Sequence, residues 1–313
     1  PPRKSPKECY EQIIADLTDA EKYAPDNDNS DRTKMTKTVA QAMLAKVYAE
    51  KEVQDYDKVI TYADKVIKTT GVELEDSYET LWGYDETTKD CLKRNTKEGI
   101  LEVHWTTGGG NWETWMYGRQ LDNWDYYFTW AKWITPSRDI INDFEKEGDE
   151  IRKNQAIVYY ACTWSNYYPA SNYPFMYKLR SSYSNIYWIR LADIILMKAE
   201  AEAYKGNLDE SAKLVNQIRK RAKLKELTSD KTNSKEAMIE AVLHERRLEL
   251  AFEGERWFDL CRNNKVEKYL NGIDNRDKGR IKQVKLFDSN SYLLPIPQTA
   301  LDQNTNLVQN PGY

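Results

Sequence analysis

Acidic and basic side chains are concentrated between His244 and Arg262, in the stretch HERRLELAFEGERWFDLCR. Two neighbouring carboxylates can act as general acid and general base, so one interpretation is a catalytic pair. The other interpretation is structural, because charges on an apolar helix face are costly unless they are paired. Each acid has an arginine nearby and none lies beside a nucleophile or a metal-binding set, so we predict a structural ion network. Its expected acids are Glu245, Glu249 and Glu253, its expected partners are Arg246, Arg247 and Arg256, and the next helical turn carries Trp257 and Asp259.

Tryptophan and tyrosine are frequent in this chain, with 10 Trp and 22 Tyr against 6 Phe. Many of them crowd into the segment between Trp105 and Trp133, interleaved with Asn, Asp, Gln and Arg. Trp and Tyr combine a flat apolar face with a hydrogen-bonding edge. A sugar ring stacks its C–H face on such a plane, while polar side chains bind its hydroxyl groups. This segment therefore predicts a carbohydrate-binding loop.

A smaller set within this segment is the predicted glycan platform. Two or three of its aromatic side chains would stack on sugar rings, and its polar side chains would bind hydroxyl groups. The alternative is that the aromatic rings only pack the loop onto neighbouring helices. A second aromatic patch, from Tyr159 to Tyr187, includes Tyr167 and Tyr168. The candidate ligand-binding residues are Asn111, Trp112, Trp115, Tyr117, Arg119, Trp124, Asp125, Tyr126 and Trp130.

Other chemistry has weaker support in the sequence. His104 and His244 have no metal-ligand spacing, and the common hydrolase and nucleotide-binding motifs are absent. Two acid pairs, Asp122 with Asp125 and Glu147 with Asp149, have the residue types that a glycoside hydrolase needs. That enzyme class is therefore the main alternative. We expect no catalytic residues, no bound metal and no cofactor.

The amino-acid composition limits the remaining classes of function. Charged residues make up 31% of the 313 residues and the net charge is −4, which gives no support for nucleic-acid binding. No run of about 18 apolar residues is present, so we expect no membrane-spanning helix. The chain is long enough to bury a sizeable core as one large domain or two small ones.

Helical patterns surround the aromatic segment. The first runs from Pro6 to Ala24, with Ser5 as its cap. A helical hairpin follows in 36–69, and a second hairpin covers 189–222 with its turn at Gly206. Small residues at helical spacing give both hairpins a tetratricopeptide-like pattern, and their separation predicts a helical repeat scaffold with a long insertion. A further helix should begin at the cap Ser234 and break or bend at Gly254.

The insertion has a different residue pattern from the helical hairpins. A short strand is expected at 100–105 and a helix at 136–147. The predicted fold class is therefore mainly α, with a tetratricopeptide-like scaffold and a loop-rich, aromatic insertion. We divide a single domain of residues 1–313 into a helical hairpin region (1–71), the insertion (72–186), and a part with the repeat, the charged helix and a C-terminal strap (187–313). The prolines in YLLPIP, residues 292–297, predict an extended strap.

Two segments carry a resemblance to a known family. RRLELAFEGERWFDLCR, residues 246–262, is similar to the signature of the SusD/RagB family, and LLPIPQTALDQNTNLVQNPGY, residues 293–313, is similar to its closing segment. The resemblance implies the SusD fold, in which a loop-rich region packs on helical hairpins. It also implies that the glycan site lies in the loop-rich part.

The function that this resemblance implies is non-catalytic. SusD-like proteins of Bacteroidetes are outer-membrane, surface-exposed lipoproteins of nutrient uptake. A member would capture an oligosaccharide or polysaccharide and pass it to a SusC-like TonB-dependent transporter. Its membrane attachment would use a lipid anchor that is not present in this sequence. Two alternatives stay open at this point: a glycoside hydrolase with a helical scaffold, and a helical repeat protein that binds peptides.

Overall fold

Helices dominate the structure, a computed structural model, which confirms the predicted mainly α fold class. It describes residues 2–88, 90–105, 134–162, 165–181, 183–280 and 282–313. Short strands are confined to the loop-rich part and pair only in twos among these residues. No described helix is long and apolar enough to cross a lipid bilayer.

The N-terminal helices begin where side chains can satisfy their first backbone N–H groups. The Ser5 side chain accepts a hydrogen bond from the backbone N–H of Glu8 at the start of α1 (Pro6–Tyr23). Thr36 and Asp55 play the same role for α2 (Lys37–Ala49) and α3 (Tyr56–Ile67). The first predicted helix and the first hairpin are therefore confirmed.

The second hairpin is formed by α8 (Leu191–Lys205) and α9 (Leu208–Arg221). Its turn requires Gly206, whose φ of 84° lies in the left-handed region that side chains disfavour. Ala199 is fully buried, and its backbone carbonyl accepts a hydrogen bond from the Ser211 hydroxyl at 2.7 Å. Small residues therefore let the two helices pack closely.

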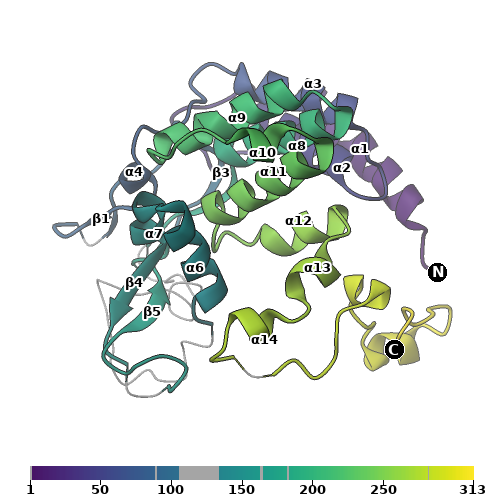
Figure 1. Ribbon diagram of the computed structural model, residues 1–313. Helices are drawn as coiled ribbons and strands as arrows, with labels where there is room; N and C mark the ends of the chain where they lie inside the picture. Colours follow the sequence, from purple (N-terminus) through teal and green to yellow (C-terminus); the bar gives the residue numbers. More distant parts are fainter. Residues whose placement is uncertain (1, 89, 106–133, 163–164, 182, 281) are drawn as a thin grey trace.

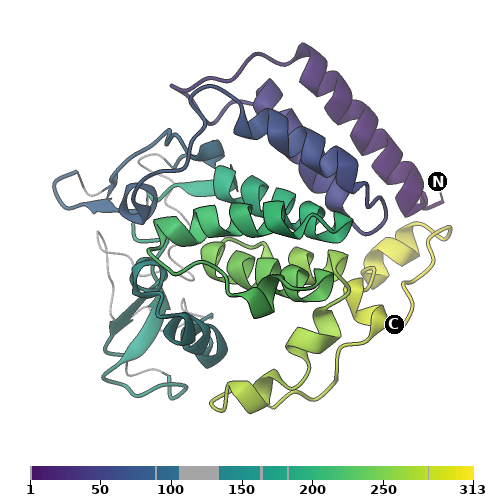
Figure 2. The same ribbon diagram turned by 45° about the horizontal axis from the view of Figure 1, so that its top comes forward.

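The two hairpins form one continuous helical layer. Helix α3 packs on α8, and α11 (Lys235–Glu249) packs on the other side of α8. Figure 2 shows these helices lying roughly side by side. Their buried apolar side chains make one core in which residues far apart in sequence meet, including Val39, Val66, Ile195, Val215 and Val242.

Helix α11 ends earlier than predicted. Ser234 caps its start as expected, by accepting a hydrogen bond from the Ala237 N–H. Its last residue is Glu249, five residues before the predicted break at Gly254. Both Phe252 (φ 66°) and Gly254 (φ 90°) are in the left-handed region, so the chain turns sharply before α12 (Arg256–Arg262).

The loop-rich part is joined to the scaffold by a strand pair. Strand β3 (Gly99–Val103) pairs antiparallel with β6 (Ile186–Arg190), which leads directly into α8. The pair therefore ties together the two ends of residues 104–185, which are most of the insertion. The other elements of this part are α4 (Tyr78–Trp82), β1 (Tyr84–Asp85), β2 (Asp90–Cys91), α6 (Arg138–Glu147), α7 (Glu150–Ala156), β4 (Ile157–Tyr160) and β5 (Tyr173–Met176).

The C-terminal part runs beneath the scaffold in the view of Figure 1 and ends near the N-terminus. The Arg3 side chain donates to Asn310 at 2.5 Å, and the Tyr292 hydroxyl donates to Glu267 at 2.6 Å. Leu294 remains 81% exposed, so polar contacts account for much of how this segment is held. The remaining short helices are α10 (Ser229–Thr232), α13 (Val266–Leu270), α14 (Ile273–Arg276), the 3₁₀ helix η1 (Ser289–Tyr292) and α15 (Gln298–Gln303).

A buried carboxylate at the end of α11 organises the junction between scaffold and insertion. The fully buried Glu249 side chain accepts from Arg190 at 2.7 Å, from Arg221 at 2.6 Å and from Arg152 at 3.2 Å. The Tyr78 hydroxyl donates to it at 2.6 Å. These partners belong to β6, α9, α7 and α4, so one carboxylate links four elements to α11. We call this set the Glu249 network.

The predicted partners in the charged helix were wrong. Glu245 pairs with Arg152 and Arg219, and Glu253 pairs with Lys178 and Arg190, all outside the stretch. Consecutive helical residues point in different directions, so Glu245 and Arg246 face different neighbours.

The arginines of the stretch have partners of their own. Arg246 pairs with Asp193 at 2.7 Å and with Asp259 at 2.9 Å. Arg247 pairs with Asp139 at 2.7 Å and with Asp143. Arg256 donates to the backbone carbonyl of Leu243 at 3.0 Å. The charges of this helix therefore bind α6, α8 and α12 to it.

Removing the central carboxylate should destabilise the fold strongly. Glu249→Gln leaves three buried guanidinium groups short of a negative charge, so the free energy of unfolding should fall by about 3–5 kcal/mol. Chemical denaturation measures this. Glu236→Gln changes an exposed residue of the same helix and should stay within about 0.5 kcal/mol. Equal denaturation midpoints for the two variants would contradict the role given to Glu249.

Stability should also fall in acid. The surrounding arginines hold the pKa of Glu249 well below its usual range against the opposing effect of burial, and Asp259 is lowered in the same way by Arg246 and Arg262. A carboxylate with a lowered folded-state pKa stabilises the fold above its unfolded pKa, and this contribution is lost as pH falls. Unfolding free energy should therefore drop below about pH 5. The slope should be shallower in Glu249→Gln, and an unchanged slope would sink this explanation.

Candidate functional site

The predicted glycan platform lies outside the residues that the structure describes. This holds for all nine candidates, Asn111, Trp112, Trp115, Tyr117, Arg119, Trp124, Asp125, Tyr126 and Trp130. Its described flanks are well anchored. The backbone carbonyl of Trp105 accepts from Arg94 at 2.9 Å, and the Thr135 hydroxyl donates to the Pro174 carbonyl at 2.8 Å.

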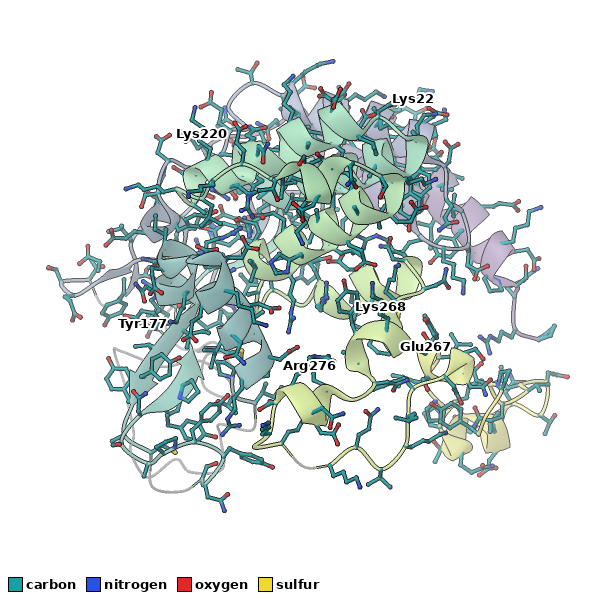
Figure 3. All side chains as sticks on the ribbon, in the orientation of Figure 1. Lys22, Tyr177, Lys220, Glu267, Lys268 and Arg276 are labelled. Atoms are coloured by element: carbon teal, nitrogen blue, oxygen red, sulfur yellow. The ribbon has the colours of Figure 1, made fainter. Side chains whose placement is uncertain are left out.

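The described chain resumes at Ile134, on the rim of a cleft. Two adjoining hollows, of about 360 and 420 Å³, share Arg138 and Tyr168 as a common wall. We call them together the Arg138 cleft. Its walls come from the start of α6, from the loop between β4 and β5, and from residues 276–280 at and after the end of α14. Figure 3 labels Arg276, one residue of the third wall.

Arg138 is held in place on several sides. Its Nη1 donates to Asp277 at 2.9 Å, and its Nη2 donates to the backbone carbonyl of Tyr167. Its guanidinium lies 4.0 Å from the centroid of the Tyr168 ring, a cation–π contact. A Cβ added at Gly279 would clash with this guanidinium. Arg138 is thus a positioned cation in the centre of the cleft.

The tyrosines of the cleft are of two kinds. Tyr168 is half-buried, its hydroxyl donates to the Pro136 carbonyl at 2.6 Å, and its ring meets Tyr173 edge-on at 5.5 Å. Burial raises the pKa of Tyr168, so it stays a neutral phenol at physiological pH. Tyr167 is 37% exposed and lines the first hollow. A flat aromatic surface beside positioned polar groups is the chemistry that a sugar ring needs.

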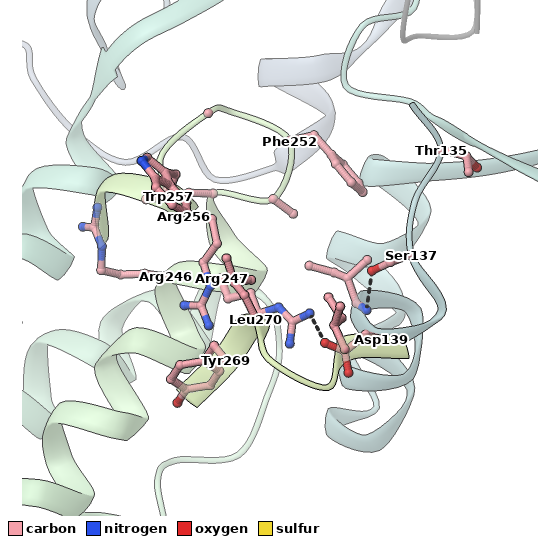
Figure 4. Close-up of a pocket in the computed structure, with 15 residues that line it drawn as sticks. Thr135, Ser137, Asp139, Arg246, Arg247, Phe252, Arg256, Trp257, Tyr269 and Leu270 are labelled. Carbon is pink, nitrogen blue, oxygen red and sulfur yellow. Dashed lines mark hydrogen bonds and ion pairs between the residues drawn. The ribbon is translucent and has the colours of Figure 1, made fainter. Parts of the chain in front are cut away.

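A second pocket adjoins the cleft and is shown in Figure 4. Its volume is about 350 Å³, and it shares Thr135 and Ser137 with the first hollow of the cleft. Phe252 and Trp257 provide apolar walls, and the strained backbone at Phe252 helps to shape it. We call it the Trp257 pocket.

Arg256 is the least neutralised cation in the Trp257 pocket. Among the described residues no carboxylate lies within ion-pair distance of it, whereas Arg246 and Arg247 each have two. It rests 4.7 Å from the ring centroid of Tyr269. Burial, together with the nearby charge of Arg247, lowers the pKa of Arg256 to about 10. The guanidinium remains charged at neutral pH.

The acid pair that could have served a glycosidase is engaged in ion pairs. Asp149 is fully buried and pairs with Arg152. Glu147 pairs with Arg219 at 3.0 Å and with His244 at 3.1 Å, and the hydrogen bond from His244 contributes most to lowering its pKa to about 2. A general acid needs a raised pKa, so Glu147 is unsuited to that role. Asp122 and Asp125 lie outside the described residues.

The histidines both sit beside carboxylates. His104 follows β3, and its Nε2 atom is 2.8 Å from the carboxylate of Glu102. His244 lies on α11, is half-buried and pairs with Glu147 of α6. In the part of the chain that the structure describes, no three His, Cys, Asp or Glu side chains gather as a metal site would require.

Comparison with known proteins identifies the family. A family model described as the SusD family matches residues 79–313, which is most of the chain. The chain belongs to the SusD family. This agrees with the resemblance carried by the charged helix and the closing segment.

Two curated SusD-like relatives come from Formosa agariphila. SusD-like protein P2 is 27% identical over 344 residues, covering 99% of this chain and 66% of that protein. SusD-like protein P38 is 39% identical over 136 residues, covering 42% of this chain and 25% of that protein. The chain thus spans 66% of the length of the first relative and a quarter of the second.

Solved SusD-like structures share the fold over nearly the whole chain. A SusD superfamily protein from Parabacteroides distasonis aligns with a TM-score of 0.77 at 25% identity, covering 99% of this chain and 70% of that one. A structure titled laminarin binding SusD-like protein aligns with a TM-score of 0.74 at 25% identity and the same coverage.

Sequence reasoning missed the residues that build the described cleft. The sequence pattern places Tyr167 and Tyr168 in a second aromatic patch, and it does not distinguish Arg138 or Asp277 from other charged residues. A local signal was present in the basic run RDKGRIKQVK, residues 276–285. What the run faces depends on the tertiary fold, because α6 precedes it by more than a hundred residues.

Gly279→Ala should displace Arg138 from its position in the cleft. The added Cβ overlaps the guanidinium, and the Arg138 side chain, 30% exposed, has room to swing outwards. The stability change should stay within about 1 kcal/mol. A crystal structure of the variant tests the displacement. If Arg138 has not moved in that crystal structure, the packing described here is contradicted. In a chain that already carries Arg138→Gln, adding Gly279→Ala should cause no further change in stability.

Proposed function

We propose that this chain is a non-catalytic, cell-surface glycan-binding protein that binds oligosaccharide in the Arg138 cleft. Family membership supports a binding role. The laminarin binding relative, at 25% identity over 99% of this chain, supports a carbohydrate as the ligand.

The observation that carries the proposal is the composition of the Arg138 cleft. Tyr167, which is 37% exposed, lines the same hollow as the positioned guanidinium of Arg138. The adjoining hollow adds Asn142 and Asn172, whose amides both donate and accept hydrogen bonds. Each hollow has a volume within the usual range of small-molecule sites.

The aromatic segment is proposed to complete this site. Its described C-terminal flank, Ile134 and Thr135, lines the Arg138 cleft, so the segment rejoins the described chain where the ligand would lie. We therefore keep the prediction that some of its tryptophans and tyrosines contact the same glycan.

The biological role that we propose is capture and transfer. The protein would hold the glycan at the outer-membrane surface and pass it to a SusC-like TonB-dependent transporter without breaking a bond. Attachment to the membrane would be through a lipid anchor. Family membership supports this role. The involvement of Glu147 and Asp149 in ion pairs favours binding over glycosidic cleavage.

Tyr167→Ala should weaken glycan binding without unfolding the protein. Loss of one aromatic face costs about 0.5–1.5 kcal/mol, so affinity should fall by about twofold to tenfold. Isothermal titration with oligosaccharides selected from a glycan array measures this. A reducing-sugar assay on the same samples should detect no new chain ends, and their appearance would contradict the non-catalytic role.

The matched control is Tyr23→Ala. Tyr23 is 72% exposed at the end of α1, a helix that Figure 1 shows on the opposite side of the molecule from α6. Its loss should leave affinity unchanged. If the protein binds no glycan, or if both tyrosine variants bind like the parent chain, the Arg138 cleft is not a glycan site.

A further inference from the structure

One wall of the Arg138 cleft is strongly basic in a chain whose net charge is −4. Residues 276–280, which form this wall, read RDKGR, with three cationic side chains and one acid. The acid, Asp277, is buried, and its carboxylate is already paired with Arg138. The wall therefore presents positive charge to the cleft.

Two of these cations stand at the cleft without a carboxylate partner. Lys278 lines one hollow and Arg280 lines the other, so they flank the shared wall at Arg138. Both are exposed, and among the described residues neither forms an ion pair. Arg276 differs, since it pairs with Asp139 at 3.0 Å.

The neighbouring Trp257 pocket repeats the pattern on other elements. Arg256 lacks a carboxylate partner there within the described residues, and the pocket joins the cleft at Thr135 and Ser137. The two sites are lined by two acids, Asp139 and Asp277, and both already form ion pairs with arginines. Uncompensated cations at adjoining hollows repel one another, and a bound anion removes that repulsion.

We propose that the Arg138 cleft takes a negatively charged glycan, with its carboxylate or sulfate groups towards Lys278 and Arg280. This inference rests on the proposed glycan-binding function and names the class of ligand. Tyr167 provides the face for the sugar ring, while the cations select for charge. Carboxylate and sulfate share the chemistry of an oxyanion that accepts charge-assisted hydrogen bonds, so the cleft alone does not choose between them.

Matched glycan pairs test the charge preference directly. Oligogalacturonate is compared with its methyl ester, and sulfated carrageenan oligosaccharides with neutral agarose oligosaccharides, by isothermal titration. The charged member of at least one pair should bind about tenfold tighter or more. Its affinity should fall between about 50 and about 300 mM NaCl, because salt screens exposed charges. Which pair responds distinguishes carboxylate from sulfate.

The variant that tests the location is Lys278→Gln combined with Arg280→Gln. It should lose about tenfold in affinity for the charged glycan and most of the salt dependence. The matched control, Lys213→Gln with Lys220→Gln, removes two exposed lysines of α9, a helix that Figure 1 shows across the molecule from α14. It should change neither the affinity nor its salt dependence. Thermal unfolding checks that both variants fold.

The outcomes separate this inference from the function on which it rests. If the neutral and the charged glycan of each pair bind with equal affinity, the proposed charge preference is wrong and the glycan-binding function stands. If the cleft variant binds the charged glycan like the parent, the anion lies elsewhere and the inference fails. If no glycan binds, both fail. If the protein binds vesicles that contain phosphatidylglycerol and no charged glycan, and Lys278→Gln with Arg280→Gln abolishes vesicle binding, the basic wall faces a membrane and the inference is overturned.

Discussion

The structure depends on one buried carboxylate and the cations around it. Glu249 ends α11, where the free backbone carbonyls give the helix a negative end, and its own carbonyl accepts from Arg190 at 2.8 Å and from Lys178 at 2.9 Å. The same cations therefore satisfy a helix terminus and a side-chain charge. Because each arginine comes from a different element, the network resists any rearrangement that would leave one charge unpaired in the interior.

This arrangement explains why the cleft has firm walls although it is built from loops. Helix α6 is tied to α11 by Arg247, which reaches Asp139 and Asp143, and Arg276 reaches the same Asp139 from the opposite wall. Arg138, one residue before Asp139, is thereby brought to the cleft. The stability of the scaffold and the geometry of the proposed binding site are linked through neighbouring residues of one helix.

The sequence predicted those features that depend on near neighbours. Ser5 and Ser234 begin helices because a short polar side chain reaches the backbone N–H three residues ahead, which is visible in the sequence. Gly206 makes its turn for an equally local reason. The hairpins and the mainly α fold could therefore be predicted well.

Features that depend on tertiary contacts were harder to predict. The partners of Glu245 and Glu253 lie on other elements, and no spacing within α11 reveals them. The end of α11 at Glu249 depends on those same partners. The described cleft was missed for the same reason, since Arg138 and Asp277 meet only after folding. The nine predicted platform residues stay a prediction, because they lie outside the described residues.

The pairing of β3 with β6 has a consequence for how such a protein can change. It brings the two ends of residues 104–185 together on the scaffold, and Arg94 and Thr135 fix the chain on either side of the aromatic segment. The entropy of closing a loop grows only slowly with its length, by about 0.6 kcal/mol for each doubling. Segments of other lengths and compositions can therefore replace this one at little cost to folding. If the aromatic segment contacts the glycan as proposed, a change of ligand would need a new segment and no new fold.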